Sequence, residues 1–493
     1  MERYRRHALV AAACLGTFLS TLDISIVNVA LPTLQVALNT DLAGLQWVVN
    51  AYAICLSAFM LSAGPLGDRF GHKRVWLVGV VLFTVGSALC AMADTLSVLL
   101  IGRAVQGVAG ALLIPGALPI LTHAFTKPTE RAHVIGGWSA FAALALILGP
   151  LLGGLLLHAH GWQAIFLINL PLGALTIALG AWGIPERKHP DHAAMDPLGQ
   201  GLSVLWLGAL TYGLIVAGEA GFSSRASWIA LLMAAIGFVV FMLVEQRVAK
   251  PLLPLAMFRH PPFAAANFAS FVLGFSCYSS LFFFSLFLQQ IQGWTPVQTG
   301  WRMMPQFVAT GCMSLCFGRL CARVSVRTLM IAGYGLIGVS MLAMTALSAD
   351  TPYWVVGTLL ALLGMGAGAA VPSTGLAVMA SAPPERAGMA SATTNALRQT
   401  GMAVGIALLG TLMSAHAIRV LTSSVHALGV PDGQPIAVAA ITHAVFAPHP
   451  SGLRALYTDA MASGFHVAMV VAGLMACLAM FALVLVKPAR PLG

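Results

Sequence analysis

The chain has 493 residues, of which 59% are hydrophobic and only 8% are charged, and its formal net charge is +10. Soluble globular proteins carry about 25% charged residues, so this composition excludes a soluble enzyme, a disordered chain and a fibrous protein. The 50 Gly and 10 Trp are typical of a polytopic membrane protein, where Gly permits close helix contacts and aromatic rings lie at the interfaces. The basic residues form no long run, so no nucleic-acid partner is expected.

Fourteen segments are apolar over the length of about 20 residues that a membrane-spanning helix needs. In chain order these predicted helices cover residues 8–32, 45–66, 75–93, 97–121, 134–157, 164–184, 197–217, 227–246, 263–290, 303–321, 327–347, 353–378, 395–415 and 464–486. The first follows Arg5 and Arg6 as a signal peptide would, but its apolar stretch continues past Asp23 to Pro32. We therefore expect a retained first helix.

The distribution of basic residues supports this map. If the N-terminus is cytoplasmic, 19 of the 25 Lys and Arg fall in inside segments and 4 in outside segments, while Arg103 and Arg398 lie within helices. A wrong number of helices would assign later loops to the opposite side of the membrane and so remove this bias. The positive-inside rule therefore predicts an all-α polytopic membrane protein with 14 transmembrane helices and both termini in the cytoplasm.

An internal repeat divides the chain. The sequence GPLGDRFGHKR at 64–74 has a weaker echo, GRLCARVSVR, at 318–327, and the two begin 56 and 55 residues after the starts of the first and ninth predicted helices. This spacing predicts two parallel six-helix bundles, residues 1–190 and 263–493, with two inserted helices and their linkers at 191–262. Residues 416–463 are expected to form an extracytoplasmic loop, because Pro and Gly interrupt them.

Seven motifs, in chain order, resemble those of the major facilitator superfamily and, within it, of the fourteen-helix drug:proton antiporters. They are LDISIVNVALP at 22–32, the 64–74 segment, IGRAVQG at 101–107, GPLLGG at 149–154, GWQAIFLINLPLG at 161–173, MDPLG at 195–199 and QQIQG at 289–293. Ala145 stands where a Gly often precedes the fourth motif. The resemblance covers nearly the whole chain. It implies a proton-driven exporter of amphipathic drugs or other small hydrophobic compounds, working without a cofactor by alternating access. The Ala- and Gly-rich composition indicates a bacterial protein, and hence a plasma (inner) membrane.

Asp23 is the one acidic residue predicted to lie deep inside a helix. A carboxylate in hydrocarbon costs several kcal/mol unless it is paired, hydrated or protonated, so it is suited to take up and release a proton. It lies ~13 Å before the outer end of its helix, and Arg103 lies ~9 Å after the outer start of its own, so we expect the two to meet. The resemblance implies that Asp23 is the proton site and Arg103 its coupling partner. A fixed structural ion pair is the alternative.

Asp68, Arg69 and Arg74 lie between the second and third predicted helices. The positive-inside rule accounts for the basic residues, but not for an Asp among glycines. The resemblance implies that Asp68 clamps the two halves together on the cytoplasmic side, facing the positive N-terminal end of the thirteenth helix near Asn395. We therefore predict that Asp68, Arg69 and Arg74 form a cytoplasmic gate rather than a proton site.

The remaining candidate residues follow from motif and polarity. Gly149, Pro150, Gly153 and Gly154 are predicted to kink the fifth helix and admit a neighbouring backbone, and the family associates this motif with exporters. Polar side chains in apolar helices need partners, and those predicted to line the substrate cavity are Asn28, Gln106, Gln289, Gln290, Asn395 and Arg398. For Arg398, snorkelling toward the membrane surface is the favoured alternative. At least half of the Phe rings in 282–287 are expected to face lipid.

Other functions and partners stay open. An exporter of a lipid or endogenous metabolite would use the same scaffold. A membrane-embedded enzyme ranks lower, because the chain has no P-loop, G-x-S-x-G or H-E-x-x-H, and its one tempting signature is His192-x-x-x-Asp196. A cavity carboxylate favours lipophilic cations, while Arg103 leaves neutral and anionic compounds open. The expected partners are a small-molecule substrate, protons and the lipid bilayer, and the family adds a periplasmic adaptor and an outer-membrane channel. No metal is expected, because His426, His443 and His449 lack zinc spacing.

Overall fold

The computed structural model describes residues 2–125, 127–186, 196–221, 224–248, 251–253, 255–383, 386–428, 433–443 and 453–486, and these contain helices and no strand. The first half contains α1 (Glu2–Ala37), α2 (Leu42–Met60), α3 (Ala63–Phe70), α4 (His72–Ala91), α5 (Leu96–Ala124), α6 (Pro128–His160), α7 (Ala164–Leu167) and α8 (Asn169–Gly183). Two further helices follow, α9 (Pro197–Ala220) and α10 (Arg225–Arg247).

The second half begins with a short 3-10 helix, η2 (Leu255–Arg259), and a long interrupted helix. In that interrupted helix, α11 (Pro261–Leu273) and α12 (Ser280–Leu286) are joined by the π-helical turn η3 (Gly274–Tyr278), and a second π-helical turn, η4 (Phe287–Ile291), follows. The remaining elements are α13 (Pro296–Cys321), α14 (Val326–Ala343), η5 (Met344–Ala346), α15 (Tyr353–Ala380), α16 (Ala387–Ala427), α17 (Gly433–His443) and α18 (Leu453–Leu485).

Local sequence explains where several helices begin. Asp41 caps α2 by accepting the Gly44 N–H at 2.6 Å, and Asp196 caps α9 in the same way. Thr295 and Gln298 form a reciprocal capping box at the start of α13. Each side-chain oxygen satisfies one of the four backbone N–H groups that the first turn of a helix leaves unpaired.

Thirteen helices in the described part of the chain are long and apolar enough to cross a membrane. They correspond to thirteen of the fourteen predicted spans. The other span, predicted at 303–321, falls within α13, which has 26 residues and carries Arg302, Gln306 and Arg319 among its apolar side chains. The all-helical membrane fold is confirmed, and the count of fourteen spans stays a prediction that depends on α13.

The two halves repeat the same helix pairs. In the first half α4 packs on α5 and α8, as α14 packs on α15 and α18 in the second. Likewise α2 packs on α5 as α13 packs on α15, and α1 packs on α6 as α11 packs on α16. This recurrence is expected of two parallel copies of one six-helix unit, while the predicted boundaries at residues 190 and 262 stay predictions.

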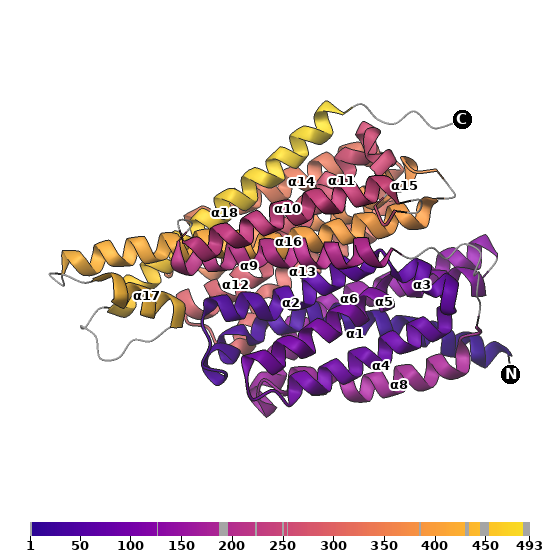
Figure 1. Ribbon diagram of the computed structural model, residues 1–493, viewed down its shortest axis with the longest axis horizontal. Coiled ribbons are helices and arrows are strands. Elements are labelled where there is room, and N and C mark those ends of the chain that lie inside the picture. The colour runs from indigo at the N-terminus through magenta and orange to yellow at the C-terminus, as the bar shows by residue number, and fades with distance from the viewer. Residues whose placement is uncertain are drawn as a thin grey trace.

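The inserted helix α9 lies over the seam between the halves, and α10 packs against α9 (Figure 1). On the first half, the Ser62 hydroxyl, between α2 and α3, donates to Gln200 Oε1 of α9 at 2.5 Å. On the second half, the Thr411 hydroxyl of α16 donates to the Leu214 carbonyl of α9 at 2.5 Å. Apolar side chains fill the contact of α2, α9 and α16: Ala43, Leu214, Ile215 and Ala407. Thus α9 is bonded to both halves.

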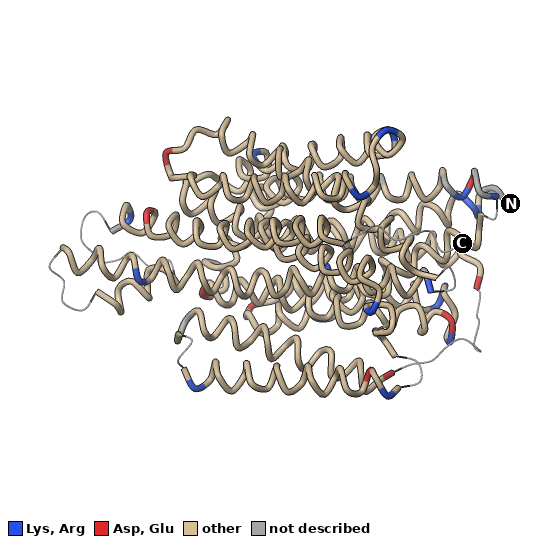
Figure 2. Tube along the Cα trace, turned by 90° about the horizontal axis from the view of Figure 1, so that it is seen from above, with Lys and Arg blue, Asp and Glu red and all other residues tan. Residues whose placement is uncertain are grey.

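The two ends of the bundle differ in charge. α1 begins and α18 ends at the same end of the molecule (Figure 1), and most Lys and Arg gather there (Figure 2). The positive-inside rule assigns this end to the cytoplasm. Below, it is called the inner end, and the opposite end is the outer end.

The outer end corrects the prediction of a loop at 416–463. α16 continues to Ala427, α17 covers Gly433–His443, and α18 begins at Leu453. The prediction is wrong for these residues because a helix need not end where the hydrocarbon ends. α16 is about 60 Å long at ~1.5 Å per residue, twice the ~30 Å thickness of the hydrocarbon. The outer part of α16 and α17 together form a segment called the outer projection below. It contains buried apolar side chains: Leu421, Val425, Ala437, Ala440 and Ile441.

The Phe-rich run at 282–287 is buried, which corrects the prediction that half or more of its rings face lipid. Phe282, Phe283, Phe284 and Phe287 each expose 3% or less of their surface. Phe287 lies 4.8 Å from Phe465 of α18, measured between ring centroids. The rings are covered because α12 and η4 lie between α1 of the first half and α18 of the second.

Candidate functional site

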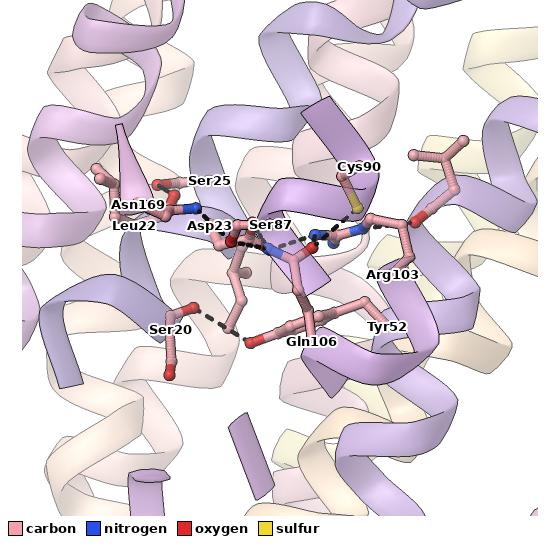
Figure 3. Close-up of polar contacts among 12 residues, drawn as sticks. Ser20, Leu22, Asp23, Ser25, Tyr52, Ser87, Cys90, Arg103, Gln106 and Asn169 are labelled. Carbon is pink, nitrogen blue, oxygen red and sulfur yellow. Dashed lines mark hydrogen bonds and ion pairs between the residues drawn. The ribbon is translucent and has the colours of Figure 1, made fainter. Parts of the chain in front are cut away.

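A buried polar cluster occupies the interior of the first half (Figure 3). Asp23 of α1 and Arg103 of α5 form an ion pair through Oδ2 and Nη1, and neither side chain exposes more than 1% of its surface. The structure therefore brings together the two residues predicted to meet. Mutual attraction offsets the cost of removing both charges from water, because the effective dielectric constant inside the bundle is low.

Gln106 connects this ion pair to the rest of the cluster. Its Nε2 donates to Asp23 Oδ1 at 3.1 Å and to Ser87 Oγ at 2.8 Å, and its Oε1 accepts from Arg103 Nη1 at 2.9 Å. Asn169 of α8 donates to the same Ser87 hydroxyl at 3.1 Å. Gln106, predicted to line the substrate cavity, thus lies fully buried beside the ion pair, with 0% of its surface exposed.

Arg103 also has neutral partners. Its Nε donates to the Val48 carbonyl of α2 at 3.0 Å, and its guanidinium carbon lies 4.5 Å from the centroid of the Tyr52 ring. The Tyr52 hydroxyl donates to the Ser20 carbonyl at 3.2 Å. These contacts do not need an ionised Asp23, so Arg103 keeps several partners when that carboxylate is protonated.

Four cluster residues are missing from the sequence-based assignment: Tyr52, Ser87, Cys90 and Asn169. Asn169 lies inside a recognised motif, and that motif is the one signal that could have found it. A single Ser, Tyr or Cys in an apolar helix carries no signal of its own. Whether it faces the cluster depends on how α2, α4 and α8 are rotated against α5.

Asp68 lies in α3 at the inner end. Its Oδ1 is 3.1 Å from Nε2 of His72, one turn along the chain in α4. Within the described residues, no hydrogen bond or ion pair joins Asp68 to α16, and α16 begins at Ala387 rather than near Asn395. The structure therefore places Asp68 in its predicted region, and the clamp onto the second half stays a prediction.

The other two predicted gate residues point to different partners. The Arg69 guanidinium carbon lies 5.4 Å from the centroid of the Phe70 ring. Arg74 pairs with Glu186 at 3.5 Å, and both side chains are partly exposed. Such exposed pairs contribute about 0–1 kcal/mol, so they fix the position of the α3–α4 junction only weakly.

The motif at 149–154 places α6 tightly against α1. A Cβ built on Gly149 would lie 3.1 Å from the backbone nitrogen of Ile26, and one built on Gly153 would lie 3.1 Å from the Ile26 carbonyl oxygen. The predicted close approach of a neighbouring backbone is therefore present, and at Gly149 a Cβ would also lie 2.8 Å from the Ser25 Cβ, so a side chain there would require the two helices to shift.

The same motif also packs α6 against α13 of the other half. A Cβ on Gly154 would lie 2.8 Å from the Pro296 carbonyl oxygen, and a Cβ on Gly300 would lie 2.3 Å from the Pro150 carbonyl oxygen. Two glycines, one from each half, thus let the outer halves of α6 and α13 touch backbone to backbone.

Three residues predicted to line the cavity lie where α1 meets α12 and η4. Asn28 is buried, with 4% of its surface exposed. Gln289 donates to the Val29 carbonyl at 3.1 Å, and Gln290 donates to Gln35 Oε1 at 3.0 Å. The amides of Gln289 and Gln290 therefore join the two halves on the outer side of the membrane, whereas the Asn28 amide donates to the Ile24 carbonyl of its own helix at 2.7 Å.

Asn395 and Arg398 lie on α16 in the second half. Arg398 Nη2 donates to Asn395 Oδ1, and the guanidinium carbon lies 5.5 Å from the centroid of the Tyr278 ring in η3. The guanidinium thus packs on an aromatic ring of the neighbouring helix, and the favoured snorkelling toward the membrane surface stays a prediction.

In the described chain, no group of three or more His, Cys, Asp or Glu could hold a metal ion. His192 and His449 lie outside the described residues. Asp196, the other member of the enzyme-like signature, accepts the Gly199 N–H at 2.8 Å as the cap of α9. Its position is therefore explained by helix geometry.

Comparisons with known proteins place this geometry in a family. The model of the Major Facilitator Superfamily matches residues 13–406. The chain is 35% identical to the methylenomycin A resistance protein of Streptomyces coelicolor, over 82% of this chain and 85% of that protein. It is 32% identical to the tetracenomycin C resistance and export protein of Streptomyces glaucescens, over 99% of this chain and 93% of that protein.

Solved structures give the same fold. A crystal structure of a bacterial homolog of the human lysosomal transporter Spinster, in an inward-facing and occupied conformation, superposes with a TM-score of 0.64 at 17% identity. The match covers 98% of this chain and 97% of that one. The chain therefore belongs to the major facilitator superfamily and is a multi-pass transporter of the plasma membrane, not an enzyme.

Proposed function

We propose that this protein is a proton-driven antiporter that exports amphipathic small molecules by alternating access. The observation that carries the proposal is the buried ion pair of Asp23 and Arg103 in the first half, in which neither side chain exposes more than 1% of its surface. An intramembrane carboxylate is expensive to keep and is usually functional. Export is supported by the relatives from Streptomyces, which are named for antibiotic resistance and, in one case, for export.

Protonation of Asp23 would change the contacts of α1. A neutral carboxyl no longer attracts the Arg103 guanidinium, which keeps the Val48 carbonyl and the Tyr52 ring as partners. α1 also reaches the second half, because the Val29 carbonyl accepts from Gln289. α1 therefore carries both Asp23 and a contact between the halves. A proton taken up at Asp23 changes the contacts of this helix, and this links proton binding to the relative position of the two halves.

The contacts between α6 and α13 support an inward-facing state. Their outer halves touch through Gly154 and Gly300. Toward the inner end, a Cβ built on Gly136, Gly137 or Gly318 would meet no atom within 4 Å. Alternating access would break the outer contacts and form inner ones, as rigid-body rocking of two repeats requires.

The test uses inverted membrane vesicles energised to an acidic interior and monitored with a pH-sensitive dye. The panel contains lipophilic cations, neutral antibiotics and acidic compounds. We expect at least one compound to cause proton loss in the wild type, and we expect Asp23→Asn to abolish it. Asp459→Asn removes an exposed carboxylate of α18 and is the matched control, with transport unchanged.

Each outcome decides a different point. Proton loss that survives in Asp23→Asn would refute the assignment of Asp23 and leave antiport intact. If no compound gives a response, the drug-exporter proposal fails, and export of a lipid or endogenous metabolite becomes the leading function for this scaffold.

A periplasmic adaptor with an outer-membrane channel stays a prediction. Contact is best tested at the outer projection, where a groove of about 510 Å³ is lined by Ile418, Arg419, Thr422, Ser423, His426 and Gln434. Replacing residues 433–443 by a flexible linker should leave vesicle transport unchanged. If an adaptor docks here, the same change should abolish export across a two-membrane envelope.

A further inference from the structure

The charges inside the membrane do not balance between the halves. Asp23 and Arg103 neutralise each other in the first half. In the second half, Arg398 lies ~17 Å along α16 from its first residue, Ala387, at about 1.5 Å per residue. Across the described residues, no Asp or Glu lies within 4.0 Å of Arg398. The Arg398 guanidinium is therefore left without a counter-charge among the described residues.

The partners of Arg398 are all neutral. Its Nη2 donates to Asn395 Oδ1, and its guanidinium packs over Tyr278 at 5.5 Å. Its Nε is buried and has no acceptor. The side chains of Asn395, Arg398 and Tyr278 are each partly exposed, so the group is not sealed inside the bundle as Arg103 is.

The backbone holds this guanidinium in place. A Cβ built on Gly274 would lie 1.8 Å from the Arg398 carbonyl oxygen, so α16 and η3 are in direct backbone contact at this level. Tyr278 follows Gly274 by about one turn of the same π-helical segment. Arg398 is thus fixed between helices of the second half.

An unpaired guanidinium in a low-dielectric site attracts an anion strongly. Its planar guanidinium holds N–H donors in a fixed geometry that fits a carboxylate or sulfonate, and the side chain of Arg398 is partly exposed, so an anion can reach it. The adjacent Tyr278 ring offers an aromatic surface to an apolar ring system. We propose that Arg398 is the anion-binding residue of the substrate site and that the exported compounds are amphipathic organic acids.

This inference rests on the proposed export function and narrows its substrate class. It reverses the expectation, based on a lone cavity carboxylate, that the substrates are lipophilic cations. The reversal follows from the charges in the structure, since Asp23 already has a cationic partner and Arg398 has no acidic partner among the described residues.

Binding and transport are measured separately on the full chain. The probes are 8-anilino-1-naphthalenesulfonate, N-phenyl-1-naphthylamine, which has the same rings without the sulfonate, and the cation tetraphenylphosphonium. Binding is measured by calorimetry on purified protein in lipid nanodiscs, with empty nanodiscs subtracted. Accumulation is measured in inverted vesicles with an acidic interior. The variants are Arg398→Gln, Arg398→Lys and the matched control Arg419→Gln, which changes an exposed guanidinium on the same helix.

We expect the wild type to bind the sulfonate at least about tenfold more tightly than the neutral amine, in line with a charged hydrogen bond. Arg398→Gln should remove that preference, Arg398→Lys should keep part of it, and Arg419→Gln should keep all of it. Equal binding of the sulfonate and the amine, or tighter binding of the cation, would overturn the inference. If Arg398→Gln does not fold, the inference is tested by the binding of the sulfonate and the amine to the wild type and to Arg398→Lys.

The accumulation measurement distinguishes failure of the anion-site inference from failure of the proposed antiporter function. Sulfonate binding that depends on Arg398, without proton-driven accumulation of any probe, would support the anion site and refute the antiporter. Accumulation of the cation but not the sulfonate would support export and refute the anion site.

Discussion

At the scale of single residues, Asp23 and Arg103 depend on each other and on Gln106. The pair is stable because the carboxylate accepts from both neighbours and the guanidinium has a carbonyl and an aromatic ring as further partners. Removing one member of a buried pair leaves the other charged and desolvated, which costs about 3–5 kcal/mol. Removing both members leaves no such charge, so the effects of the two substitutions should not add.

Arg103→Gln is therefore expected to lower the free energy of unfolding by about 3–5 kcal/mol, unless Asp23 takes up a proton. Adding Asp23→Asn to that variant should recover part of the loss. Thermal melting of the purified single and double variants at several pH values measures both effects. Strictly additive losses in the double-mutant cycle would show that the two side chains do not interact.

At the scale of elements, α6 and α13 meet through glycine because two backbones must touch. A Cβ on Gly300 would lie 2.3 Å from the Pro150 carbonyl oxygen, whereas a Cβ on Gly318 of the same helix would meet nothing within 4 Å. A methyl group is therefore accommodated at one end of α13 and excluded at the other. In the proposed alternating-access mechanism this contact belongs to one state of the cycle, so a change there should act on transport more than on the fold.

Gly300→Ala is expected to separate the outer halves of α6 and α13, at a cost of about 1–3 kcal/mol from overpacking. Vesicle transport should fall about tenfold or more, and a cysteine placed beside the outer contact should become more reactive to a membrane-impermeant thiol reagent. Gly318→Ala is the matched control, with normal transport and labelling. Normal transport in Gly300→Ala would mean that this contact does not form during the cycle.

At the scale of the whole molecule, α9 joins the halves across their seam. Its hydrogen bonds reach Ser62 on one half and Thr411 on the other. A Cβ on Gly218 would lie 3.1 Å from the Thr411 Cα, while a Cβ on Gly208 of the same helix would meet no atom within 4 Å. α9 thus has one face fitted closely to α16 and another face open.

Gly218→Val should therefore push α9 away from α16 and destabilise the protein by about 1–3 kcal/mol, as overpacking does. Gly208→Val, with the same added side chain on the open face, should change the stability by less than about 0.5 kcal/mol. Melting temperatures in one detergent compare the two variants. Equal losses would show that the effect comes from the valine itself and not from the contact with α16.

The sequence by itself determined the membrane class, thirteen of the spans, the charge asymmetry of the two ends and the similar depth of Asp23 and Arg103 in the membrane. These features depend on apolar length, on the positions of Lys and Arg, and on family motifs, which are all local. Only the tertiary structure decided which helix faces meet. For that reason it alone places Gln106 beside the ion pair, uses Gln289 and Gln290 to join the halves, extends α16 beyond the hydrocarbon, and leaves Arg398 without an acidic partner in the described chain.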